Sequence, residues 1–338
     1  MIQHARQSTP ARQRAAHVLR RAARTLLPTL AAALIALPAM PARALDWEVR
    51  TAPDQTAAQA AFTQALQQAH AEAARTEDEP ANAGVRTRST RPRTQEAQRL
   101  IVAVGPEAAR TALEQGGEEP LLMAMLSRLD HESLRAAAAL QGSNRRIGVL
   151  LREPSPADQL ELIEAVLPGR RRIGVVVTAS SEPMLRELQR AAESDGRGWS
   201  LQVEQASDPL ALGTALRAVL PRSDALIVLA DAIGNSQAAT LALLHAAAAA
   251  RVPVFGSSEG IVRSGALAAT VSTPEQLAQQ ALGMGERLAA SPAGAPTLVH
   301  SATPANVRIN PNVARSLDLR LPSEQELNRR LATAGKGP

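Results

Sequence analysis

Two short apolar runs joined by an alanine-rich segment form the clearest pattern in the chain. The runs cover residues 225–229 and 252–256, and each has the length of a β-strand. The segment between them, residues 235–251, is long enough for a helix of four turns. Parallel strands need such a crossover, so the pattern predicts a strand, a helix and a second, parallel strand.

The same alternation extends over most of the chain. Further strands are predicted at residues 46–50, 101–104, 121–126, 146–151, 173–177, 201–204, 267–271 and 307–309. Helices are predicted at residues 55–74, 106–115, 134–140, 157–167, 182–193 and 274–289, and from residues 209 and 324 onward. Strands and helices in turn predict an α/β fold in which parallel sheets carry helices on both faces.

Three helix starts are predicted from local chemistry. Thr273 is followed three residues later by Gln276, and Ser323 by Glu326, which are the two partners of a capping box. Ser181 stands directly before the helix predicted at residues 182–193, where its hydroxyl would accept a free backbone N–H.

Residues 76–98 interrupt the alternation. They contain two prolines, a glycine, a short acidic run and four spaced arginines, Arg86, Arg88, Arg91 and Arg93. This composition predicts a solvated loop, with a docking surface for an acidic partner as the alternative. Only the alternation at Val85, Thr87 and Ser89 offers a strand here, and it would be an edge strand.

Small polar residues follow the predicted strands. Ligands of open parallel sheets bind beyond the carboxyl ends of the strands, so these residues are the candidate ligand contacts. They are Gly105, Glu107, Ser127, Ser180, Asp231, Asn235, Ser257, Ser258 and Glu259. Hydroxyls, amides and helix N-termini predict a small polar or anionic ligand. The alternative is a purely local role, because Asn and Ser are common at turns and helix starts.

The segment at residues 252–267 resembles a signature of the ABC transporter substrate-binding protein family, which has the type I periplasmic-binding fold. It reads Val252-Pro253-Val254-Phe255-Gly256-Ser257-Ser258-Glu259-Gly260-Ile261-Val262-Arg263-Ser264-Gly265-Ala266-Leu267. Residues 159–175, 272–277 and 313–323 are similar to that family in the same order, and the resemblance covers residues 99–331.

The resemblance implies two lobes that hold a small molecule between them and deliver it to the permease of an ABC transporter. Residues 45–145, completed by 272–293, would form the N-terminal lobe, and residues 146–271, completed by 294–331, the other. A monomer without a cofactor is expected. The strand exit Ala230-Asp231-Ala232-Ile233 departs from the Asp-Asn-Thr pattern of members that bind amino acids, so the ligand stays open.

The positive net charge of the chain comes from its first 44 residues. The 338-residue chain has a net charge of +5, but residues 1–44 hold seven arginines and no acid, so the remainder carries 5 − 7 = −2. A basic start, an apolar run and Ala42-Arg43-Ala44 predict a cleaved signal peptide. The mature chain would then be periplasmic, and its negative balance argues against nucleic acid as a partner.

One motif in the sequence favours a catalytic function as the alternative to solute binding. Gly256-Ser257-Ser258-Glu259-Gly260 satisfies G-x-S-x-G, so an α/β-hydrolase-like esterase using Ser258 is the alternative function. Fewer than 80 residues follow that motif, and His300 is the one later histidine. The chain has no cysteine, and its six histidines lack ligand spacing, so neither metal nor catalysis is expected.

We predict that the exported protein begins at Leu45 or within a few residues of it, because signal peptidase cuts after a small-x-small pattern. Intact-mass measurement of the exported fraction checks this. A product that still carries residues 1–44 would contradict the prediction.

Overall fold

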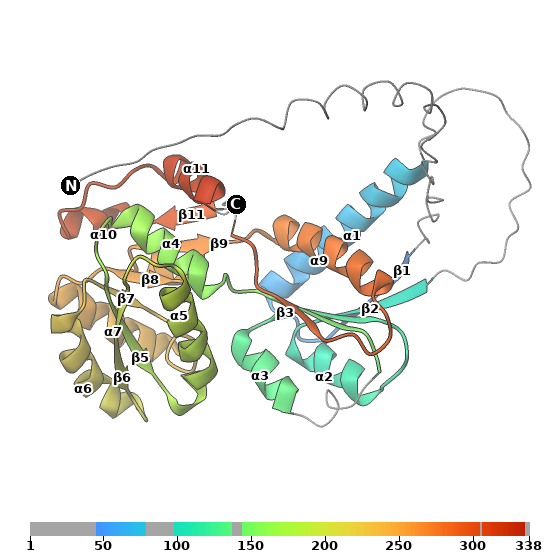
Figure 1. The fold of residues 1–338 in the computed structure, drawn as a ribbon, viewed down its shortest axis with the longest axis horizontal. Helices are drawn as coiled ribbons and strands as arrows, with labels where there is room; N and C mark the ends of the chain where they lie inside the picture. Colours follow the sequence, from blue (N-terminus) through green and yellow to red (C-terminus); the bar gives the residue numbers. More distant parts are fainter. Residues whose placement is uncertain (1–44, 79–97, 137–143, 305, 335–338) are drawn as a thin grey trace, which may run out of the picture. The chain divides into compact units, whose positions relative to one another are not determined.

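The computed structural model describes residues 45–78, 98–136, 144–304 and 306–334, which form two sheets with their helices (Figure 1). We call each sheet with its covering helices a lobe. The predicted signal peptide, the possible strand at Val85 and the four loop arginines lie outside the described residues.

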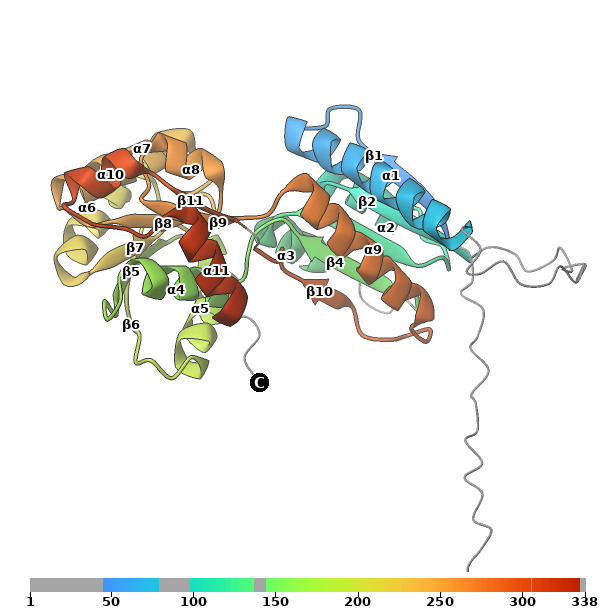
Figure 2. The same cartoon turned by 90° about the horizontal axis from the view of Figure 1, so that it is seen from above.

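The first sheet has five parallel strands in the order β1-β2-β3-β4-β10. Its strands are β1 (Leu45–Thr51), β2 (Gln98–Val104), β3 (Leu121–Leu126), β4 (Ile147–Leu151) and β10 (Leu298–His300). Its helices are α1 (Ala57–Asp78), α2 (Pro106–Glu114), α3 (Arg128–Ala136) and α9 (Pro274–Ala290). Helices α1 and α9 lie side by side on one face (Figure 2), while α2 and α3 pack against β2, β3 and β4 from the other.

The second sheet has six strands in the order β11-β9-β8-β7-β5-β6, with β11 antiparallel to its neighbour. Its strands are β5 (Arg172–Val177), β6 (Ser200–Gln205), β7 (Ala225–Ile227), β8 (Val254–Gly256), β9 (Ala268–Val271) and β11 (Asn306–Ile309). Its helices are α4 (Pro156–Val166), α5 (Glu182–Ser194), α6 (Pro209–Val219), α7 (Gln237–Ala249), α8 (Glu259–Ser264), α10 (Pro311–Ser316) and α11 (Glu324–Ala334), with 3₁₀ turns at Ala179–Ser181 and Leu220–Arg222.

Continuous apolar strands result because both faces of each sheet are covered. In β2, Leu100 and Val102 pack with α1 and α9, whereas Ile101 and Ala103 pack with α2 and α3. Successive strand residues point to opposite faces, so a strand without polar positions is what this sandwich requires. In such central strands the polar groups are therefore found at the strand ends.

The predicted fold class is confirmed, and two of the predicted caps are seen. Thr273 accepts from Gln276 N at 3.3 Å while Gln276 Oε1 accepts from Thr273 N at 2.8 Å, and Ser323 Oγ accepts from Glu326 N at 3.2 Å. The Ser181 cap is wrong, because its hydroxyl makes no bond to the start of α5.

The strand pairing differs from the predicted lobe limits. Residues 146–151 and 294–300 were assigned to the second lobe, but β4 pairs with β3 and β10 pairs with β4 in the first sheet. Strand β4 lies between β3 and the edge strand β10, and no local pattern in the sequence records these pairings. Helix α3 also begins at residue 128 rather than 134, because Ser127 and Asp130 cap its start reciprocally, at 2.8 and 3.0 Å.

The chain passes between the sheets three times, at residues 152–155, 272–273 and 301–304. Hydrogen bonds join these crossing segments. Ala302 N donates to Glu153 O at 3.0 Å, and the Ser272 hydroxyl donates to Thr303 O at 2.7 Å. The crossings are thus fastened to one another.

Alanine substitutions at two glycines of α9 should change the stability of the fold in opposite directions. A Cβ at Gly285 would lie 2.5 Å from the Trp47 ring and 2.7 Å from Leu100, so we expect Gly285→Ala to lower the free energy of unfolding by about 1–3 kcal/mol. A Cβ at Gly283 would meet no atom within 4 Å, so Gly283→Ala should raise it by about 0.5–1 kcal/mol. Urea unfolding of both variants is the measurement. Equal effects of the two substitutions would contradict this packing.

Candidate functional site

A charged cavity of about 440 Å³ is lined by residues of both lobes. Its walls come from α3, from α5, and from residues at the ends of β4 and β10. Four arginines line it, Arg128, Arg135, Arg186 and Arg190. Two glutamates and one histidine lie among them, Glu132, Glu187 and His131. We refer to this space as the charged cavity.

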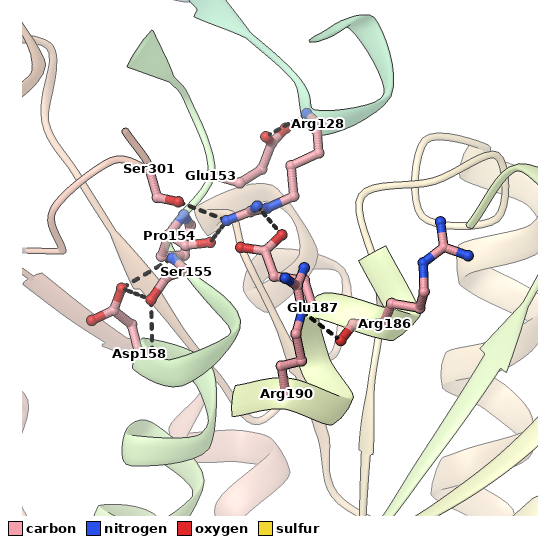
Figure 3. A network of polar contacts seen from close by, with 9 residues as sticks. All are labelled: Arg128, Glu153, Pro154, Ser155, Asp158, Arg186, Glu187, Arg190 and Ser301. Atoms are coloured by element: carbon pink, nitrogen blue, oxygen red, sulfur yellow. Dashed lines mark hydrogen bonds and ion pairs between the residues drawn. The ribbon is translucent and has the colours of Figure 1, made fainter. Parts of the chain in front are cut away.

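Arg128 is the best-anchored cation of the charged cavity, with a side chain 12% exposed. Its Nη1 donates to Glu187 Oε2 on α5 of the second lobe. Its Nη2 donates to the Ser301 hydroxyl at 2.7 Å and to Pro154 O at 3.4 Å, which are in two of the crossing segments (Figure 3). One guanidinium therefore contacts both lobes and two crossings.

The Glu153 carboxylate helps to fix the position of Arg128. It is 5% exposed, its Oε2 accepts from Arg128 N at 3.1 Å, and its Oε1 accepts from Arg152 Nε at 3.0 Å. Burial raises the pKa of Glu153 above its ordinary value of 4.5, and the arginines only partly oppose that rise. A carboxylate here is held at a cost in hydration.

The remaining cations differ in their partners. Arg186 pairs with Glu182 at 3.0 Å and Arg135 with Glu132 at 2.9 Å, each along its own helix. Arg190 Nε donates to Arg186 O at 3.3 Å, and within the described ranges no carboxylate lies in ion-pair distance of Arg190.

The lining is positive overall. Four arginines and two glutamates give 4 − 2 = +2. His131 adds little to that balance, because burial lowers the pKa of its imidazole below 6.5. The cavity thus offers a cationic space suited to an anionic or strongly polar ligand.

Asp231, the central residue of the predicted site, is used within the second lobe. It is 1% exposed, its Oδ1 accepts from Ile233 N at 2.9 Å and from Gly234 N at 3.0 Å, and its Oδ2 accepts from the Ser181 hydroxyl. The carboxylate therefore holds the turn after β7 and ties it to the segment after β5. Ser181 has this partner in place of the predicted helix start.

Two predicted residues of the first lobe also have local roles. Ser127 is 2% exposed and caps α3. Gly105 begins α2 with φ 89°, and a Cβ there would lie 2.3 Å from the Gln59 amide. Glu107 is exposed and lines a different cavity, of about 660 Å³, beside the segment after β1.

The predicted residues of the second lobe lie at the strand exits. The Ser180 hydroxyl is 2.9 Å from Thr178 Oγ1, and Asn235 Nδ2 donates to Ala230 O at 3.3 Å. Ser257 is half-buried, and Glu259 pairs with Arg263 at 3.2 Å. None of the nine predicted residues lines the charged cavity.

Ser258 has the geometry of a helix cap. Its backbone is extended, at φ −147° and ψ 153°, and its hydroxyl accepts from Ile261 N at 3.4 Å. His300, the histidine required by the hydrolase alternative, is in β10 of the first sheet. Among the described residues no group of three His, Asp or Glu side chains is arranged to hold a metal ion.

The sequence prediction missed the residues that line the charged cavity. Arg128 directly follows Ser127, so this part of the cavity lies next to a predicted strand exit. Glu187 and Arg190 are three residues apart on a helix and carry no local signal of binding. Only the contact with Arg128, 59 positions away in sequence, reveals Glu187.

The buried Glu153 predicts a pH effect on stability. Because the pKa of Glu153 is raised in the folded state, its favourable contribution to the free energy of unfolding is complete below the unfolded pKa of about 4.3. That contribution is lost as the pH rises through the folded pKa. Gln is neutral throughout, so the stability of wild type should fall relative to Glu153→Gln over that rise. Urea midpoints from pH 4 to pH 8 measure this, with exposed Glu259→Gln as the control. Parallel pH profiles for wild type and Glu153→Gln would contradict the assignment.

Comparison with solved structures shows the same fold in three bacterial proteins. An ABC domain from Streptococcus pneumoniae in complex with L-Trp is 17% identical, with 85% of this chain and 98% of that one covered and a TM-score of 0.50. A conserved domain protein from Vibrio cholerae is 21% identical, with 85% and 98% covered and a TM-score of 0.51. A ligand-free, open substrate-binding protein with adhesive properties from Clostridium difficile is 16% identical, with 84% and 97% covered and a TM-score of 0.58.

Further observations concern the family of the chain and its relation to a membrane. A search of curated proteins gave no match. In the part of the chain that the structure describes, no helix combines the length and the apolar character needed to cross a bilayer. The sequence profile of ABC transporter substrate binding proteins matches residues 57–328, most of the 338-residue chain. The chain therefore belongs to the ABC transporter substrate-binding protein family.

Proposed function

We propose that this protein captures a small polar solute in the charged cavity and delivers it, as a periplasmic monomer, to an ABC transporter permease in the inner membrane. The observation that carries the proposal is the lining of that cavity by both lobes, with α3 and the ends of β4 and β10 from the first lobe and α5 from the second. Ligands of open parallel sheets bind at such ends.

Capture depends on contacts from both lobes. A solute that contacts α3 of the first lobe and α5 of the second favours the conformations in which these walls are close. The three crossing segments are the places where the chain can bend for this purpose. Their mutual hydrogen bonds, Ala302 to Glu153 and Ser272 to Thr303, would make them bend together.

The solute differs in kind from the aromatic amino acid of the Streptococcus pneumoniae complex. No Trp or Phe lines the charged cavity in the described chain, and Phe62 and Phe255 are buried in the two cores. Trp199 stacks beneath the Arg171 guanidinium, 4.7 Å from its ring centroid. Hydrogen bonds and charge, rather than stacking, would hold the solute.

The protein would be exported before it binds the solute, and residues of the second lobe would contact the solute as well. Residues 1–44, with the composition of a signal peptide, would direct the chain to the periplasm. Ser180, Ser257 and Asn235 stand at strand exits of the second lobe and are proposed as solute contacts when the walls close. Ser258 would act as a helix cap, and no bond of the solute would be broken.

We expect the protein to retain one equivalent of solute when it is purified gently from the exported fraction, because a cavity lined from two lobes releases its ligand slowly. Native mass spectrometry detects the added mass, and denaturation followed by mass spectrometry identifies the solute. Protein that has been stripped and refolded should take up the same compound again.

The enzyme alternative gives a different result. An esterase would release an altered compound or turn over small acyl esters, and that activity would vanish in Ser258→Ala. A protein that carries no solute, and that gains none in a thermal-shift screen of polar metabolites, would contradict the binding role.

A further inference from the structure

Building on the solute-binding role proposed above, we propose that the solute is an acid whose oxyanion group binds Arg128 in place of Glu187. The Glu187 carboxylate would be an internal stand-in for the solute, occupying the anion position while the cavity is empty. The shared chemistry is that of a carboxylate or a phosphate, both of which fit the planar fork of a guanidinium.

The guanidinium of Arg128 is already fixed for this purpose. Two contacts on Nη2, Ser301 Oγ at 2.7 Å and Pro154 O at 3.4 Å, hold it from the crossing segments, and Nη1 faces Glu187. The side chain is 12% exposed. A cation that is anchored in this way loses little freedom when an anion binds, so more of the contact energy appears as affinity.

Glu187 is the replaceable partner of the pair. Its side chain is 35% exposed, nearly three times the value for Arg128, and it lines the charged cavity. Glu187 reaches Arg128 across the cavity from α5, whereas Ser301 and Pro154 contact it from the crossings (Figure 3). Partly exposed ion pairs contribute little net stability, so an incoming oxyanion can displace Glu187 at low cost.

Arg190 supplies the position to which Glu187 can move. It lies three residues after Glu187 on α5, a spacing that brings two side chains of a helix together. Within the described chain Arg190 has no carboxylate in ion-pair distance, while Arg186 is occupied by Glu182 and Arg135 by Glu132. Glu187 would therefore exchange Arg128 for Arg190 when the solute enters.

The exported protein should be tested with succinate, inorganic phosphate and neutral succinamide in calorimetric titrations. We expect Glu187→Gln to bind at least one of the two anions at least tenfold more tightly than wild type, because the internal competitor is gone, and to leave succinamide unchanged. A response to succinate identifies a carboxylic acid, and a response to phosphate a phosphate-bearing solute. Glu182→Gln, on the same helix and in an ion pair, is the matched control and should behave as wild type.

Arg128 is tested in the Glu187→Gln background. Adding Arg128→Gln should abolish the gain, and adding Arg128→Lys should keep part of it, with urea midpoints confirming that each variant folds. Adding Arg190→Gln should leave the gain, whereas Arg190→Gln alone should weaken anion binding by severalfold, since the displaced Glu187 then lacks its new partner.

Three results would overturn the inference. They are equal anion affinity in wild type and Glu187→Gln, no detectable anion binding by Glu187→Gln, and an equal gain in Glu182→Gln. If the purified protein carries a neutral or cationic solute whose affinity is unchanged in Arg128→Gln, the binding role stands and this inference fails. If the protein carries no solute at all, the binding role itself fails.

Discussion

The covering of both faces of each sheet is the constraint on which the rest of the structure depends. Alternate residues of a strand such as β2 pack against different helices, so polar side chains have no place along the strand. In the central strands polar chemistry is therefore restricted to the strand ends, and in parallel sheets the carboxyl ends lie together. The charged cavity, the Asp231 turn and the crossing segments all lie at those ends.

Within that constraint, Arg128 connects elements that are remote in sequence. The end of β3 places it, Ser127 and Asp130 fix the helix that it begins, and Glu153 accepts from its backbone N–H. Its guanidinium then joins two crossing segments to α5. A change in what Arg128 binds would thus reach the proposed bending points of the chain, which is the coupling that a solute-binding protein needs.

The predictable parts of the fold are those governed by local chemistry. The apolar runs indicated parallel strands, and the caps at Thr273 and Ser323 followed from residues three positions apart. Membership of β4 and β10 in the first sheet was not predictable, because pairing at a sheet edge depends on residues far along the chain. The predicted contacts stand at strand exits, and none of them lines the charged cavity. Asp231 and Ser181 satisfy each other across 50 positions, and Arg128 and Glu187 across 59, which local patterns cannot show.

A crystal structure of the exported protein with its solute retained tests the central claim most directly. The account predicts solute density in the charged cavity, in contact with the Arg128 guanidinium and with at least one residue of α5. Density confined to one lobe, or located beside Glu107 in the other cavity, with Arg128 still paired to Glu187, would contradict it.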